Sequence, residues 1–220
     1  MADQLPDAWL SCDPLPADPV PILWGWLAEA FEAQRQPNPN AVALATVDPD
    51  GRPSVRMVLC NEIDVARGAF TMYTNLESRK ARALRAHPQA SIVFYWGPHD
   101  RQARVEGPVG STPAARCDTY FATRPLDAKI SAWASRQSEP VESRAALLAV
   151  ARSEAERFGV ASDAGRAEPI PRPPFWGGYT LVAESVELWV SRPGRIHDRA
   201  LWRRSLADEP GPWRVMRLQP

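Results

Sequence analysis

AVALATVDPDGRPSVRMVLC, residues 41–60, holds two runs rich in β-branched and apolar residues, separated by the turn residues DPDG. An Asp-Gly turn between two such runs is a strong signal of a β-hairpin. The stretch therefore predicts two antiparallel strands.

The segments around this hairpin alternate in character. Further strands are predicted at 68–75, 90–96 and 101–111, with a closing three-stranded meander at 178–191, 195–204 and 212–220. A helix capped by Asp18 is expected to end before residue 36, and a short basic helix follows Tyr73 and Thr74. Residues 113–158 show helical spacing in three segments, and 159–175 is a predicted loop. The pattern indicates an α+β chain built on a small antiparallel barrel.

Composition limits the classes of partner. The 220 residues carry 26 Lys and Arg against 26 Asp and Glu, which argues against a nucleic-acid footprint. Three widely spaced cysteines suggest neither a disulfide framework nor a zinc site, and we expect free thiols in the cytoplasm. No signal peptide or apolar run of membrane-spanning length is present. We expect an extended N-terminal arm at 1–17 and a single domain at 18–220.

Two places resemble anion sites. Ser78, Arg79 and Lys80 open the basic helix, where unpaired N–H groups and two cations can hold a phosphate, although an ordinary solvated basic turn is the alternative. Tyr120 and Arg124 are four residues apart, hence on one helical face, and can hold a second anion.

The stretch RIHDR poses a separate question. In a strand, Arg195, His197 and Arg199 share one face and require something anionic or electron-rich opposite them, unless they only protect a solvated edge. Trp189 precedes them and is either a core residue or a cofactor contact. Arg56 interrupts an apolar strand face, which is costly unless it meets a carboxylate or phosphate. Since no Gly-rich phosphate loop or metal-ligand spacing occurs, we expect a phosphorylated organic cofactor and a second anionic ligand.

The motifs RMVL, YTNLESRKA, YFATRP, ISAWASRQS, FWGGY, ELW, RIHDR and WRVMRLQP, in this order, resemble the pyridoxamine/pyridoxine 5′-phosphate oxidase family of FMN enzymes. The resemblance implies an FMN-binding split β-barrel with flanking helices that forms a homodimer with FMN at the subunit interface. It implies FMN contacts from Arg56, Val58, Leu59, Tyr73, Thr74, Arg79, Lys80 and Gln102. From the partner subunit it implies contacts by Gln137, Ser138, Trp189 and Arg199.

The same resemblance implies a phosphorylated pyridine as substrate, oxidised at its 4′ carbon with O2 as the final acceptor. Tyr120 and Arg124 match residues that bind the substrate phosphate, and Arg195 and His197 match the catalytic pair. Two substrate-binding positions depart from the family, since Asn61 replaces a lysine and Ala128 replaces a serine. The alternatives are a same-family oxidase of dihydrophenazine carboxylates and a non-catalytic module that binds flavin or pyridoxal phosphate.

Overall fold

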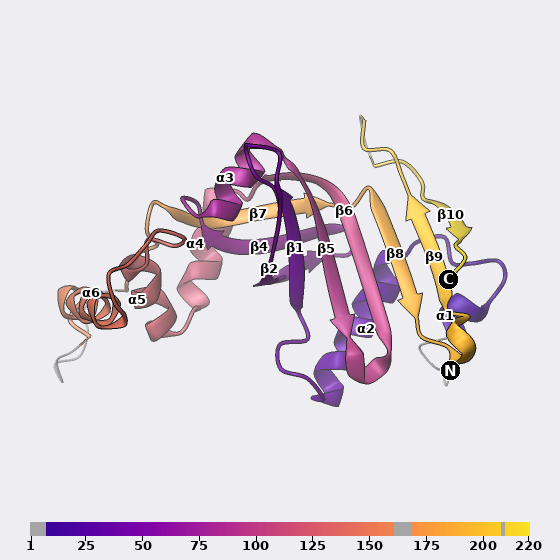
Figure 1. Ribbon diagram of the computed structural model, residues 1–220, viewed down its shortest axis with the longest axis horizontal. Coiled ribbons are helices and arrows are strands. Elements are labelled where there is room, and N and C mark those ends of the chain that lie inside the picture. The colour runs from indigo at the N-terminus through magenta and orange to yellow at the C-terminus, as the bar shows by residue number, and fades with distance from the viewer. Residues whose placement is uncertain (1–7, 161–168, 208–209) are drawn as a thin grey trace.

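The structure, a computed structural model, describes residues 8–160, 169–207 and 210–220 (Figure 1). Its helices are α1 (Ala8–Ser11), α2 (Val20–Ala33), α3 (Arg79–Ala86), α4 (Ala114–Thr123), α5 (Leu126–Ala134) and α6 (Arg144–Arg157). Its strands are β1 (Ala41–Val47), β2 (Pro53–Leu59), β3 (Glu62–Asp64), β4 (Ala69–Asn75), β5 (Gln89–Trp96), β6 (Arg101–Ser111), β7 (Trp176–Val182), β8 (Ser185–Val190), β9 (Asp198–Arg203) and β10 (Arg214–Arg217). The predicted α+β class is confirmed.

The strands form one antiparallel sheet that curls on itself. Its main path runs β10-β9-β8-β6-β5-β1-β2, and β3, β4 and β7 close onto it through β6. The predicted hairpin is confirmed, with Ala41 opposite Leu59 and Val47 opposite Pro53. Figure 1 shows β2 toward one edge and β9 and β10 at the opposite edge, with α5 and α6 projecting beyond β7.

Strand β6 joins the two parts of the sheet. Its first half pairs with β8, and its last residues pair with β7. At the change of partner, a side chain on Gly107 would place a Cβ atom 2.0 Å from the carbonyl oxygen of Val182. Only glycine allows this close approach of two backbones, so Gly107 fixes where the sheet divides.

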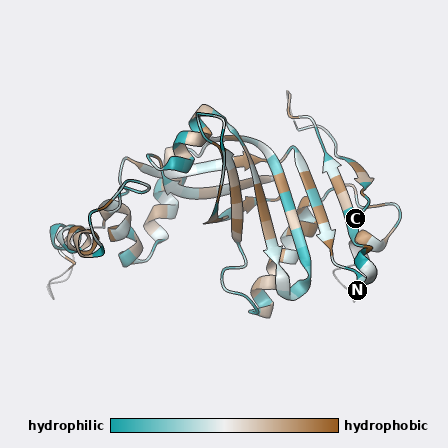
Figure 2. Cartoon of the chain, in the orientation of Figure 1, coloured by the Kyte–Doolittle hydropathy of each residue, from teal (hydrophilic) through white to brown (hydrophobic). Residues whose placement is uncertain are grey.

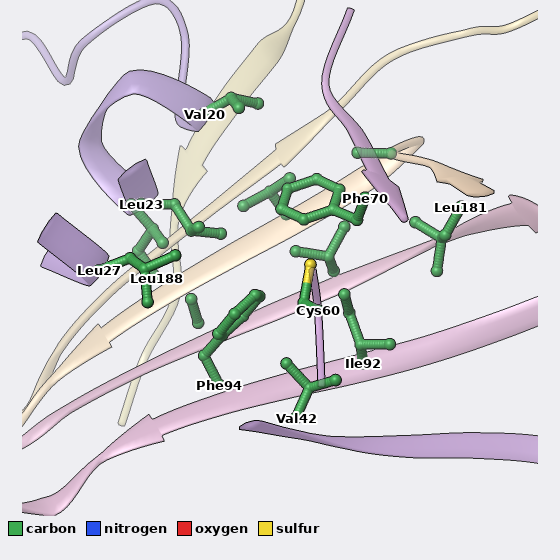
Figure 3. Close-up of a cluster of buried hydrophobic side chains, with 14 of the residues drawn as sticks. Val20, Leu23, Leu27, Val42, Cys60, Phe70, Ile92, Phe94, Leu181 and Leu188 are labelled. Carbon is green, nitrogen blue, oxygen red and sulfur yellow. The ribbon is translucent and has the colours of Figure 1, made fainter. Parts of the chain in front are cut away.

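The core lies between the sheet and α2. Leu23 and Leu27 of α2 pack against strand residues that include Phe94 and Leu188 (Figure 3), and Trp26 of α2 belongs to the same buried cluster. Figure 2 shows apolar and polar residues alternating along the strands, as expected when one face of a sheet is buried. Each large side chain buried here contributes about 1.5–3 kcal/mol of transfer free energy, so this contact anchors the sheet that carries the site.

Several predicted elements need correction. The segment 178–191 is two strands, because the chain leaves β7 at Val182 and enters β8 at Ser185; the meander is β8-β9-β10. Strand β3 was not predicted. Phe31 follows the helical spacing of the apolar residues in α2, but its side chain is 49% exposed. Within the predicted arm, residues 8–11 form a helical turn, and residues 1–7 and residues 161–168 of the predicted loop lie outside the described residues.

The described part of the arm packs against its own chain. Leu10 is buried, and its carbonyl oxygen accepts a 2.7 Å hydrogen bond from Nη1 of Arg217. The indole of Trp202 donates to the carbonyl of Pro16 at 2.8 Å. Within the described ranges, no helix combines the length and apolar character needed to cross a bilayer.

Candidate active site

A cavity of about 750 Å³ opens beside β2 and β4. Its walls also include the start of α3, parts of α4 and α5, and the segment that follows α5. It brings together most of the predicted cofactor and substrate residues. These are Arg56, Val58, Leu59, Asn61, Tyr73, Thr74, Arg79, Lys80, Tyr120, Arg124, Gln137 and Ser138.

One end of the cavity is cationic. The ammonium of Lys80 donates to Oγ1 of Thr74 at 3.0 Å, Oγ of Ser78 at 3.2 Å and Oε1 of Gln137 at 2.6 Å. All three acceptors are neutral, so the positive charge has no carboxylate partner among them. Burial, reinforced by the charge of Arg56, lowers the pKa of Lys80 to about 8. A half-buried cation with only neutral acceptors is suited to receive an anion.

Arg56 and Arg79 reinforce this end in different ways. Arg56 donates to Oγ1 of Thr46 and Oγ of Ser54, both at 2.7 Å, so it meets neutral oxygens of its own chain rather than a carboxylate. Arg79 is held by Asp48, whose Oδ2 accepts from Nε at 3.0 Å. Hydrogen bonding to Arg79 lowers the pKa of the Asp48 carboxyl. Since only Arg79 is neutralised in this way, the end keeps a net positive charge.

A second part of the cavity wall is aromatic. Tyr73 and Tyr120 stack with ring centroids 4.0 Å apart and 8° between planes, and Trp176 lies parallel to Tyr73 at 5.4 Å. The guanidinium of Arg124 lies 4.8 Å over the Trp176 ring. Its Nη1 is buried and has no hydrogen-bond partner among the described residues. Gly178 makes the stack possible, because a Cβ there would lie 2.9 Å from Cδ1 of Tyr73.

Two charged residues that sequence reasoning missed hold Tyr73. Glu62 accepts from the Tyr73 hydroxyl at 2.7 Å and from Nε of Arg116 at 2.6 Å. Burial, with the hydrogen bond to Glu62, raises the pKa of Tyr73, so the phenol keeps its proton. No sequence spacing connects Glu62 with Arg116, because β3 and α4 meet only in the folded chain.

Gln102, Trp189 and Arg199 lie elsewhere, on the outer face of the sheet. They are directly opposite one another on β6, β8 and β9. Arg199 is held by Oε1 of Glu187, which accepts from its Nε at 2.9 Å and its Nη2 at 2.8 Å. The other carboxylate oxygen of Glu187 accepts from Arg104 at 2.6 Å, and Glu187 is buried. Glu187 was also missed, since only the fold brings its two arginines to it.

The predicted strand face of Arg195, His197 and Arg199 is wrong. Strand β9 begins at Asp198, and Arg195 ends a short 3₁₀ turn (Pro193–Arg195) with φ of 63°. His197 precedes the strand and packs on Trp189 with ring centroids 4.7 Å apart. Its Nδ1 accepts from the backbone N–H of Arg192 at 3.1 Å. The neutral imidazole therefore carries its proton on Nε2.

Three other predicted site residues lie in places that differ from the expectation. Gln137 bonds to Lys80, and Oγ of Ser138 accepts from the backbone N–H of Arg79 at 3.2 Å, so both line the cavity of their own chain. Ala128 does not line the cavity. Ser131, which was not predicted, does line it, and its hydroxyl donates to the carbonyl of Ala128 at 3.1 Å.

Comparisons with known proteins agree with this geometry. Residues 27–158 match the family model described as pyridoxamine 5′-phosphate oxidase, and residues 176–220 match the pyridoxine 5′-phosphate oxidase C-terminal dimerisation region. A pyridoxine/pyridoxamine 5′-phosphate oxidase of Burkholderia lata is 48% identical over 92% of this chain and 89% of its own. One of Rubrobacter xylanophilus is 46% identical over 97% of this chain and 92% of its own.

Solved structures show the same fold. The crystal structure of PhzG from Burkholderia lata, in complex with tetrahydrophenazine-1-carboxylic acid, has a TM-score of 0.82 and 31% identity, covering 100% of this chain and 98% of that one. A pyridoxamine 5′-phosphate oxidase-related, FMN-binding protein of Nostoc punctiforme has a TM-score of 0.67 at 19% identity, covering 89% and 96% of the two chains, and supports the split-barrel fold alone. The chain therefore belongs to the pyridoxamine 5′-phosphate oxidase family of oxidoreductases.

Proposed function

We propose that this protein is an FMN-dependent oxidase that converts pyridoxamine or pyridoxine 5′-phosphate to pyridoxal 5′-phosphate, with O2 reduced to H2O2. The observation that carries the proposal is a single cavity lined both by Lys80, a cation whose hydrogen-bond acceptors are neutral, and by Arg124, whose buried Nη1 has no hydrogen-bond partner among the described residues. Two separate anion sites suit a phosphorylated cofactor and an anionic substrate. The curated relatives named for this reaction support the choice.

The residues present fit FMN. The cavity volume falls within the range of cofactor sites, and Lys80 with Arg56 offers charge for a phosphate. Val58 and Leu59 provide an apolar wall for a ring system. Bound FMN would supply acceptance of two electrons from the substrate carbon and their transfer to O2. The chain's own task is then to bind both ligands, stack their rings and exclude water.

We infer that the site is completed by a second copy of the chain. One continuous row of cross-strand partners runs from β2 to β9, so β2 and the β8–β9 pair share an outer face. The residues of this row are, in order, Met57, Ala43, Val93, Arg104, Glu187 and Leu201. Five strand spacings separate β2 from β9, or roughly 24 Å, too far for Leu59 and Arg199 of one chain to touch the same ring. Val55 and Met57 on this face are 67% and 64% exposed and suit a dimer interface.

Subunit complementation tests this arrangement. Lys80→Met removes the cation of the cavity, and Arg199→Leu changes the residue expected from the partner. A heterodimer of the two variants should contain one intact site, whereas each homodimer contains none. Activity restored on co-expression supports the shared site, and a mixture that stays inactive counts against it.

Arg195 and His197 would then act from the partner's outer face. His197 lies on Trp189, in the same row as Arg199, and its free Nε2–H can donate to a ring oxygen of the substrate or move a proton. Arg195 is exposed and free to position the 4′ amine or alcohol. Both roles require the dimer, so the subunit complementation experiment tests them as well.

A second candidate function is oxidation of a dihydrophenazine carboxylate. Asn61 adds no charge to the substrate end, and Ala128 adds no hydroxyl, so Arg124 is the only cation of the predicted substrate-phosphate set. A monoanionic carboxylate suits one cation better than a phosphate dianion does. The fold similarity to PhzG, solved with a tetrahydrophenazine carboxylate, supports this candidate.

Peroxide release in air separates the candidates. The FMN-loaded protein is given pyridoxine 5′-phosphate, unphosphorylated pyridoxine or a dihydrophenazine carboxylate. The main proposal predicts turnover of the first and little of the other two. Turnover of the carboxylate alone would favour the second candidate, and a yellow protein that oxidises none of them would be a binding module.

We infer a cytoplasmic location from the thiols. Cys60 and Cys117 are free thiols, and both are buried. Burial raises the pKa of the Cys117 thiol, which keeps it protonated and unreactive. Free thiols persist in reducing compartments.

A further inference from the structure

The side chain of Asn61 has a defined orientation. Its Oδ1 accepts a 3.2 Å hydrogen bond from the backbone N–H of Tyr73. A backbone N–H can only donate, so the atom that faces it must be the amide oxygen. The amide nitrogen therefore faces the Tyr120 hydroxyl, at 2.7 Å.

This orientation decides the direction of the Tyr120 proton. An amide NH2 is a donor only, so the Tyr120 oxygen must accept from Asn61. The phenolic hydrogen of Tyr120 is then available to donate to another group. Burial raises the pKa of Tyr120, so the hydrogen is retained at neutral pH. Tyr120 lines the cavity and is therefore a donor into it.

The stacked neighbour Tyr73 has the opposite role. Its hydroxyl donates to the carboxylate of Glu62 at 2.7 Å. The phenolic hydrogen of Tyr73 is therefore already engaged within the chain and is not directed to a substrate. The two parallel phenols, 4.0 Å apart, thus differ in what they offer. Only Tyr120 has a proton left for a ligand.

Arg124 supplies a second donor from the same helical region. Its Nη1 is buried without a hydrogen-bond partner in the described part of the chain, which is costly unless a ligand accepts from it. We propose that Asn61 is a positioning residue that makes Tyr120 a hydrogen-bond donor to the anionic group of the substrate, alongside Arg124. The inference rests on the proposed function only in taking this cavity as the substrate site.

The role differs from that of a direct ligand. Both polar atoms of the Asn61 amide that face neighbours are used within the chain, one by Tyr73 and one by Tyr120. Asn61 thus selects for an acceptor-rich group, a phosphate ester or a carboxylate, without adding charge. Its effect must pass through the Tyr120 hydroxyl.

A double-mutant cycle isolates that path. The variants are Asn61→Ala, Tyr120→Phe and the double variant, each loaded with FMN. Two unreactive anions serve as probes, 4-deoxypyridoxine 5′-phosphate and phenazine-1-carboxylate, with 4-deoxypyridoxine and phenazine as their neutral controls. Dissociation constants are measured by calorimetry, and FMN affinity and thermal midpoint are measured in parallel to detect misfolding.

The expected result is non-additive. Each single variant should lose about tenfold affinity for the anion that binds, and the double variant should lose no more than Tyr120→Phe alone. Binding of the neutral control should not change. The Asn61→Asp carboxylate can still accept from the backbone N–H of Tyr73, but it would also accept the hydrogen bond of the Tyr120 hydroxyl. This variant should therefore lose at least as much affinity for the anion as Asn61→Ala.

Additive losses near a hundredfold in the double variant, or equal losses for the neutral controls, would overturn the inference and leave the proposed function standing. A Tyr120→Phe variant that binds the anion as tightly as the wild-type protein would also overturn the inference and leave the proposed function standing. If wild-type protein binds FMN but neither anion, the substrate proposal fails and this inference fails with it.

Discussion

Nζ of Lys80 lies 2.6 Å from Oε1 of Gln137, although the two residues are 57 positions apart in the chain. The contact brings the segment after α5 onto the first turn of α3. It also holds a half-buried cation with a neutral amide oxygen in place of a carboxylate. The protein therefore keeps a positive charge ready at this end of the cavity.

FMN affinity should depend on the protonation of Lys80. Because burial lowers its pKa to about 8, the cation is present below that pH and lost above it. The dissociation constant for FMN should be nearly constant from about pH 7 to 8, where the phosphate is already a dianion, and should rise by up to about tenfold per pH unit above pH 8, since a bound phosphate favours the charged form of Lys80. Fluorescence titration of FMN across this range measures the change.

Lys80→Arg provides the control, because an arginine stays charged throughout the range. Its FMN affinity should not change around pH 8. The stability of the folded apo-protein should change with pH in the opposite direction to FMN affinity. Because folding lowers the pKa of Lys80, keeping this lysine charged destabilises the fold most below pH 8, and the destabilisation decreases as pH rises toward the ordinary lysine pKa. A wild-type FMN affinity that is flat across pH 8 would contradict the role given to Lys80.

Gly107→Ala should disrupt the division of the sheet. The new Cβ would lie 2.0 Å from the carbonyl oxygen of Val182, so backbones must separate. We expect a loss of about 3 kcal/mol or more in the free energy of unfolding. Gly110→Ala in the same strand meets nothing within 4 Å and should change stability by less than about 1 kcal/mol. Equal denaturation midpoints for the two variants would refute this account of β6.

Glu187→Gln should weaken FMN binding without removing any predicted FMN contact. The buried carboxylate orients Arg199 through two hydrogen bonds, and its loss leaves the guanidinium with a weaker anchor, the 2.9 Å hydrogen bond from Nη1 to the carbonyl oxygen of Gln219. We expect about a tenfold higher dissociation constant. Arg104→Gln is the matched control, because Arg104 shares Glu187 but is not a predicted contact. A larger effect from Arg104→Gln would show that Glu187 acts through general stability.

Asn61→Lys should shift preference toward phosphate. A second cation beside Arg124 favours a dianion over a monoanion by about tenfold. The ratio of dissociation constants for 4-deoxypyridoxine 5′-phosphate and phenazine-1-carboxylate measures the shift. An unchanged ratio would mean that position 61 does not face the anionic group.

The local elements were predictable because their signals are local. The DPDG turn specifies the β1–β2 hairpin, and β6 spans the predicted residues 101–111. Residues 126–134 form α5 as their spacing indicated. In each case turn residues or side-chain period within one segment decide the conformation.

The errors arise where distant contacts decide. TLVAESVEL has one unbroken strand pattern, but Ala183 bonds to the carbonyl of Gly68 and Glu184 to that of Glu106, which splits it into β7 and β8. Arg195 and His197 alternate as in a strand, yet Gly194 and Arg195 take positive φ angles and form a turn. The supporting carboxylates Asp48, Glu62 and Glu187 were missed for the same reason, since their arginine partners are remote in sequence.

The proposed oxidation can be followed in an anaerobic visible spectrum of the FMN-loaded protein, recorded before and after adding pyridoxine 5′-phosphate. We expect bleaching of the flavin band, then recovery with release of H2O2 when air is admitted. A flavin band that stays oxidised would contradict the proposed substrate, and failure to bind FMN at all would contradict the site itself.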